Sequence, residues 1–162
     1  MKKMRVLMCL AGLLVTGTTL GAMPILIGPV IPYADKDVGN ENVQNECDWN
    51  KRMPDQLVRN SEGKLRLETP ENAESAPSRL ELLTTALHTI GGGGLTGPKW
   101  IALSGSLYQD GLLAASFTAL RRTMRGSFSG CKTLVSLSEE LSGDILEWLE
   151  NPVMDAKLGD QK

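Results

Sequence analysis

His88 is the only histidine in the chain, and it is the residue best suited to acid–base chemistry near neutral pH. In a serine hydrolase, such a histidine takes the proton from a serine hydroxyl while a carboxylate orients the imidazole. Ser104, Ser106 and Ser116 fall on segments that are predicted to be neighbouring strands, so one of these serines could contact His88. The sequence has no nucleophile-elbow pattern, however. We therefore expect no catalytic residues and keep a small hydrolase using His88 and a strand serine as the alternative.

The glycine-rich residues 91–97 invite comparison with a phosphate-binding loop, since Lys99 follows them closely. That motif requires glycine directly before lysine, then serine or threonine at the start of a helix. Here Pro98 separates Gly97 from Lys99, and a strand-like segment follows. The four glycines at 91–94 therefore predict a long connection between strands, and their role as a lid or a linker stays open. With a single histidine available, we expect no metal site and no cofactor.

Basic residues concentrate between Leu82 and Ser138, where Asp110 is the only acidic residue and the net charge is +4. The basic residues of this segment are Lys99, Arg121, Arg122, Arg125 and Lys132. The arginines end a predicted strand close to the start of the last helix, and guanidinium groups beside a helix N-terminus suit phosphate or carboxylate. Arg121, Arg122, Arg125 and Lys132 are thus a candidate site for an anion or a partner. The alternative is an ordinary strand end whose arginines pair with acidic helices.

The first 22 residues have the order of a secretory signal peptide. The cationic residues Lys2, Lys3 and Arg5 precede a short apolar run and then a stretch of small and polar residues ending at Ala22. The apolar run is too short to span a bilayer, although an uncleaved membrane anchor is the alternative. Cleavage after Ala22 leaves 14 basic and 19 acidic residues, a net charge of −5. An acidic protein is a poor candidate for binding nucleic acid, so we exclude that partner.

Cleavage would also remove Cys9 and leave Cys47 and Cys131, which allow one intramolecular pairing. Such a bond is expected to form in an oxidising compartment. Free buried thiols or a bond between two chains are the alternatives. We predict a Cys47–Cys131 disulfide and a periplasmic protein, with secretion or membrane anchoring by an uncleaved signal as the other localisations.

Hydrophobic spacing predicts one α+β domain over residues 23–152, followed by a flexible tail at 153–162. Strands are expected at 24–33, 79–90, 100–108 and 112–123, with a short strand near 64–68. Asp110-Gly111 is a strong signal for a tight hairpin turn. Helices are expected at 41–53, ended by Pro54, and from Cys131 to Pro152; residues 54–79 otherwise read as loop. The predicted fold is an antiparallel sheet of three to five strands with two helices on one face, linked by the disulfide.

The segment from Gly105 to Pro152 resembles small exported bacterial envelope proteins of unknown function. The resemblance rests on the hairpin at Asp110, the strand carrying Phe117 and Arg121, the glycine-rich corner, and the cysteine-containing helix that ends at Pro152. It covers roughly the last third of the chain and implies an exported domain of similar plan without an activity. We therefore expect a non-catalytic binding module for an anionic envelope component or another protein; the oligomeric state is not predicted.

Overall fold

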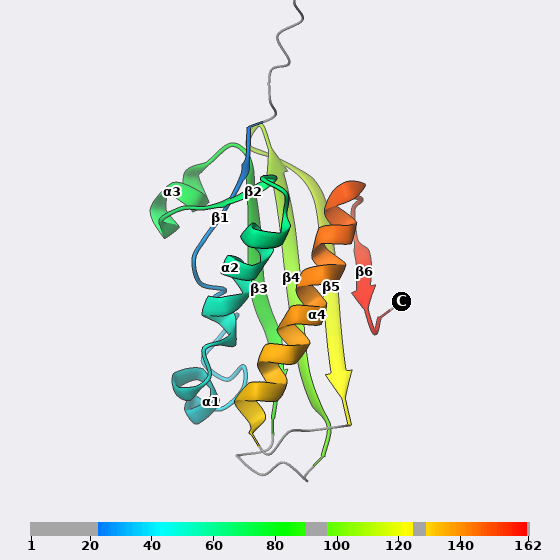
Figure 1. Ribbon diagram of the computed structural model, residues 1–162. Helices are drawn as coiled ribbons and strands as arrows, with labels where there is room; N and C mark the ends of the chain where they lie inside the picture. The colour runs from blue at the N-terminus through cyan, green and yellow to red at the C-terminus, as the bar shows by residue number, and fades with distance from the viewer. Residues whose placement is uncertain (1–22, 90–96, 125–128, 162) are drawn as a thin grey trace, which may run out of the picture.

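The computed structural model describes residues 23–89, 97–124 and 129–161, and the expected signal peptide lies outside them. Its elements are layered, with a mixed sheet behind and the helices α2 and α4 in front (Figure 1). The elements in chain order are β1 (Ile25–Ile27), α1 (Glu41–Glu46), α2 (Trp49–Asn60), β2 (Leu65–Leu67), α3 (Pro70–Ser75), β3 (Arg79–His88), β4 (Lys99–Gln109), β5 (Leu112–Thr123), α4 (Gly130–Glu150) and β6 (Ala156–Gly159). The α+β prediction is confirmed.

Six strands in the order β2-β1-β3-β4-β5-β6 form the sheet. The central strands β3, β4 and β5 form the predicted antiparallel meander, and the β4–β5 turn has positive φ at both Asp110 (52°) and Gly111 (77°). The outer pairs are parallel, however, with β1 beside β2 and β3, and β6 beside β5. The prediction of an antiparallel sheet of at most five strands is therefore wrong. Short outer strands carry too little hydrophobic pattern to reveal their direction.

The predicted helix at 41–53 is two helices, because the chain leaves the helical conformation at Cys47, where φ is −99° and ψ is 124°. Pro54 lies inside α2 and does not end it, contrary to expectation. Proline lacks the N–H that would bond to the carbonyl of Asn50 four residues earlier. That carbonyl instead accepts the N–H of Ile31 at 3.0 Å, and the Asn50 side chain donates back to the Ile31 carbonyl at 3.1 Å. The residues after β1 thus satisfy the group that Pro54 leaves free.

Two further segments differ from the prediction. Residues 54–79, expected as mostly loop, include the rest of α2, the short β2 and the single-turn helix α3. Residues 153–162, expected as a flexible tail, include β6, which pairs with residues 117–120 of β5. This segment is held by its backbone pairing with β5 and by Leu158, whose side chain is buried (5% exposed).

The predicted disulfide between Cys47 and Cys131 is present, with Cα atoms 5.0 Å apart. Cys131 is the second residue of α4, whereas Cys47 lies at the C-cap of α1 and not inside a helix. The bond therefore joins the α1–α2 junction to the start of α4. Because α2 and α4 also pack against each other, the helix layer is one unit covering one face of the sheet. Its buried residues, shared between helices and strands, include Trp49, Met53, Leu57, Ile101, Leu103, Phe117, Leu134, Leu141, Ile145 and Trp148.

Candidate functional site

The second face of the sheet is left largely uncovered by the described helices, and we call it the open face. Along β4 and β5 every second side chain points to it, while the intervening ones are buried against α2 and α4. Small and polar residues fill its middle, and an aromatic residue stands near each end of β4, Trp100 and Tyr108. The helix α3 and residues 28–32 lie at its margin, beside β1 and β3. The open-face residues of β4 and β5 are Trp100, Ala102, Ser104, Ser106, Tyr108, Ser116, Thr118, Leu120 and Arg122.

Trp100 and His88 form a stacked aromatic pair at one end of the open face. They are cross-strand partners in the β3–β4 ladder, and their rings are 4.0 Å apart at an interplanar angle of 12°. One face of the indole is thereby supported by the imidazole. The side chain is half-buried, so stacking fixes the orientation of an accessible ring.

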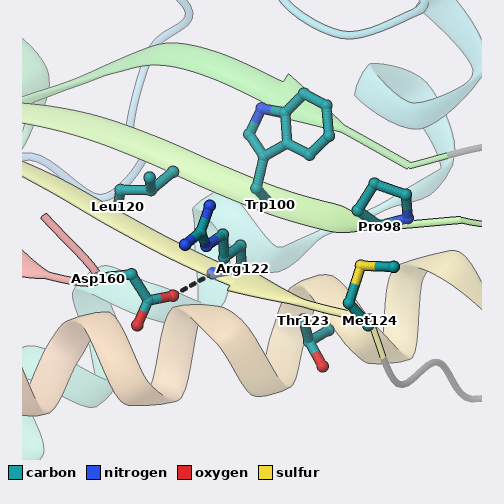
Figure 2. A pocket seen from close by; sticks show the side chains of 7 residues that line it. All are labelled: Pro98, Trp100, Leu120, Arg122, Thr123, Met124 and Asp160. Atoms are coloured by element: carbon teal, nitrogen blue, oxygen red, sulfur yellow. Dashed lines mark hydrogen bonds between the residues drawn. The ribbon is translucent and has the colours of Figure 1, made fainter.

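An open depression of about 900 Å³ lies beside this pair (Figure 2). Trp100 and Arg122 point to the same side of the sheet, away from α4, whereas Thr123 points toward the helix. Trp100 and Arg122 are directly opposed across β4 and β5. The residues lining the depression are Pro98, Trp100, Leu120, Arg122, Thr123, Met124 and Asp160.

Arg122 is an exposed cation in this depression. Its backbone N–H donates to Asp160 Oδ2 at 2.8 Å, which ties the end of β6 to β5. Its guanidinium makes no ion pair with any other residue of 23–89, 97–124 or 129–161. Met124 beside it is 78% exposed. The depression therefore combines an aromatic face, an accessible guanidinium and an apolar margin.

Arg121, by contrast, lies on the helix-facing side of β5 and is engaged there. Its guanidinium donates two hydrogen bonds of 2.7 Å to the Asp144 carboxylate, which is 9% exposed. Glu140 and Asp160 are further ion-pair partners, at 3.7 and 3.5 Å. The hydrogen bonds to Asp144 raise the pKa of Arg121 above its ordinary value. This is the alternative that the sequence left open, an arginine paired to an acidic helix.

The three described candidates, Arg121, Arg122 and Lys132, are thus not brought together as one patch. Arg121 and Arg122 occupy opposite faces because successive strand residues alternate. Lys132 is exposed on the first turns of α4, on the helix side of the sheet. Arg125 and the glycines at 91–94 lie outside the described residues. Among the described candidates, only Arg122 lines the depression beside Trp100.

The alternative hydrolase site is not assembled either. His88 is opposite Trp100, and Ser104 is four residues further along β4, roughly 13 Å at about 3.3 Å per residue. Ser106 and its cross-strand partner Ser116 lie further still. Ser116 Oγ hydrogen-bonds to Asp155 Oδ1 at 3.1 Å. No proton transfer between His88 and these serines is within reach.

Two buried polar residues, Lys99 and Thr89, of which the sequence drew attention only to Lys99, lie on the helix-facing side at the same end of the sheet. Lys99 is 1% exposed and Thr89 is 7% exposed. Thr89 directly follows His88 and Lys99 directly precedes Trp100, and His88 and Trp100 are the last cross-strand pair of β3 and β4. Lys99 was visible as a basic residue before a strand, but its burial follows from strand alternation with Ile101 and Leu103.

Within the described ranges, no group of three histidine, cysteine or acidic residues is placed to hold a metal ion. The same part of the chain contains no helix that combines the length and the apolar character needed to cross a bilayer.

No model of a known protein family matches the chain, and no curated protein matches it in sequence. Two solved structures of the PelC dodecamer from Paraburkholderia phytofirmans are similar in fold. One, of a PelC variant, is 14% identical, with a TM-score of 0.46 over 73% of this chain and 84% of that chain. The other is 13% identical, with a TM-score of 0.42 over 74% of this chain and 84% of that chain.

Proposed function

We propose that this chain is an exported, non-catalytic binding module that takes an anionic envelope component at the Trp100–Arg122 end of its open face. The observation that carries the proposal is the accessible Arg122 guanidinium opposite an indole that His88 holds in place. A planar or apolar part of the ligand stacks on Trp100, and an acidic group pairs with Arg122. An acidic surface of a protein partner offers the same chemistry and is the second form of ligand.

The physical argument is that the indole of Trp100 and the backbone that carries Arg122 are both held in place before binding. Stacking on His88 limits the rotamers of Trp100, and backbone pairing fixes the strand that carries Arg122. A preorganised contact loses less conformational entropy when the ligand arrives. Arg122 is exposed, so salt screens its attraction to an anion. Without Trp100 to stack on the ligand, this attraction contributes only modestly to the binding free energy. We therefore expect the two residues to act together.

Export is the other half of the proposal. It is supported by the order of charges and apolar residues in 1–22 and by the disulfide, which suits an oxidising compartment. We place the mature protein in the periplasm, with secretion as the alternative. The hydrolase alternative lacks support, because the structure holds His88 on Trp100 and away from the strand serines.

The test is equilibrium binding of the exported protein to a defined panel: phosphatidylglycerol vesicles, lipopolysaccharide and peptidoglycan, with phosphatidylcholine vesicles as the uncharged reference. Trp100→Ala and Arg122→Gln should each weaken binding to the recognised anionic probe about tenfold or more. Arg59→Gln is the matched control, since Arg59 is an exposed cation of α2 on the other side of the molecule. It should leave binding within twofold.

Two results would overturn the proposal. Equal losses in all three variants would show attraction to net charge without a site. Binding that is indifferent to Trp100→Ala and Arg122→Gln would place the ligand elsewhere. Loss of a captured protein partner in both open-face variants, together with no affinity for the panel, would select the protein-partner form.

A further inference from the structure

Exposed large apolar side chains are spread unevenly over the described residues. Eight are exposed, and three of these, Val30, Leu83 and Met124, lie elsewhere in the fold. The other five lie at one end of the molecule, which we call the apolar end: Met23, Leu112, Leu113, Val153 and Met154. Isolated exposed apolar residues are ordinary on a protein surface, whereas a gathered group marks an interaction site.

Strand directions place four of these residues close together. Leu112 and Leu113 are the first residues of β5, directly after the β4–β5 turn. Val153 and Met154 connect the end of α4 to the start of β6, and β6 runs parallel to β5. The Val153 carbonyl accepts the N–H of Ser116 at 3.4 Å, which holds this connection beside the first half of β5. We call these four residues the tip residues.

Met23 lies at the same end, on the far side of the sheet. β1 runs parallel to β3, and Leu26 is opposite Arg79, whose β4 partner Tyr108 is close to the β4–β5 turn. This is the upper end in Figure 1, where β1 and β6 begin and α4 ends. In the sequence, Met23 directly follows residues 1–22, whose apolar run is predicted to engage the membrane during export. The described domain is therefore joined to that segment at its apolar end.

The connection between α4 and β6 is held firmly, yet its side chains face solvent. Trp148 Nε1 donates to the Val153 carbonyl at 3.2 Å, and the Asp155 N–H donates to Ser116 Oγ at 2.9 Å. Asp155 also has a φ of 53°, which residues other than glycine rarely adopt. Despite these constraints, Val153 and Met154 are 49% and 50% exposed. The fold thus fixes this connection in a shape that presents apolar side chains outward.

The neighbouring residues favour an apolar surface over an anionic one as the partner. Asp110 lies in the β4–β5 turn, and Asp155 directly follows the α4–β6 connection. These carboxylates give no attraction to anionic headgroups, so the hydrophobic effect must supply the affinity. Tyr108 is half-buried and is the cross-strand partner of Leu113. Tyrosine suits the headgroup level of a membrane, because its ring is apolar and its hydroxyl is polar.

We propose that the apolar end docks on the surface of a lipid bilayer, with the tip residues inserted among the upper parts of the acyl chains. Burial of their exposed apolar area supplies the binding free energy. A bilayer is favoured over a protein partner because the predicted export segment joins the domain at this same end. The Trp100–Arg122 depression lies at the other end of β4 and so faces away from the membrane. This proposal does not depend on the function proposed above.

The test is sedimentation of the disulfide-bonded, exported protein with phosphatidylcholine vesicles, with the partition coefficient measured over a lipid titration. Phosphatidylcholine has no net charge, so its binding reports apolar contact. Leu112→Ser/Leu113→Ser and Val153→Ser/Met154→Ser should each weaken the partition about tenfold or more, because each removes two exposed apolar side chains. Added salt should change it less than about twofold, because no charge pairing holds this end.

The matched control is Val30→Ser/Leu83→Ser, which removes two exposed apolar side chains away from the apolar end. It should leave the partition within twofold. Phosphatidylcholine with a spin label in its acyl chain gives a second readout, of position. It should broaden the methyl resonances of the tip residues and spare those of Val30 and Leu83.

Three outcomes would refute the proposal. Absence of any partition onto the vesicles would leave the apolar end to a protein partner. An equal loss in the control variant would show general adhesion of exposed apolar residues. An unchanged partition in both tip variants would place the membrane contact elsewhere in the chain, an uncleaved signal peptide included.

Discussion

Removing the disulfide should cost this fold a large part of its stability. The cysteines are 84 positions apart, and the chain-entropy relation gives about 4.6 kcal/mol for closing a loop of that length at 25 °C. Native strain and residual structure in the unfolded chain reduce this figure, so we expect Cys47→Ala/Cys131→Ala to lower the free energy of unfolding by about 3–4 kcal/mol. Alanine is chosen because Cys47 is buried (4% exposed), and a serine hydroxyl there would add a desolvation penalty.

Urea unfolding monitored by circular dichroism measures this loss directly. The m-value should also rise, because an uncrosslinked unfolded chain exposes more surface. The reduced wild-type protein is the control and should unfold like the double variant. A loss below about 1 kcal/mol with an unchanged m-value would contradict the reasoning, because the bond would then not restrict the unfolded chain.

Two further substitutions test the packing on the helix side of the sheet. Arg121→Leu should destabilise the fold by about 2–4 kcal/mol, since it leaves the buried Asp144 carboxylate without its guanidinium. In chemical unfolding, the double variant Arg121→Leu/Asp144→Leu should recover most of this loss. No recovery would mean that the pair does not act as a unit. Gly105→Ala should lower the free energy of unfolding by about 1–3 kcal/mol, because a methyl group at this buried β4 position meets the Phe117 ring. An unchanged Tm would show that the ring moves aside freely.

The regular, central parts of this fold could be predicted from the sequence. Alternation in 100–108 and 112–123, with Asp110-Gly111 between them, predicts the β4–β5 hairpin because each signal is local. The α4 pattern spans 21 residues and is equally local. Two cysteines left after the expected cleavage predict the disulfide by counting alone. The hairpin and helix predictions depend only on residues close together in the sequence, and the disulfide prediction depends on two cysteines that have only each other as partners.

The errors arise where distant residues decide the structure. Pro54 remains in a helix because Ile31 bonds to the carbonyl it leaves free. Residues 156–159 form a strand because β5 offers an unpaired edge. No pattern within α2 or the C-terminal segment contains that information.

The candidate site illustrates the same limit. A run of nearby arginines predicted one patch, yet strand alternation sends Arg121 to Asp144 and Arg122 to the open face. The register of β3 and β4 then brings His88 against Trp100. Register is a tertiary property, so spacing alone could identify the charged segment but not the pairs within it.

The indole resonance of Trp100 offers the most direct test of binding at the open face. The other tryptophans, Trp49 and Trp148, are buried at 0% and 6% exposed, so they serve as internal references in the same spectrum. Addition of the recognised anionic probe should shift the Trp100 indole N–H saturably and leave Trp49 and Trp148 in place, and Arg122→Gln should abolish the shift. Saturable binding that leaves the Trp100 resonance unmoved would contradict the assignment of the open face as the binding surface.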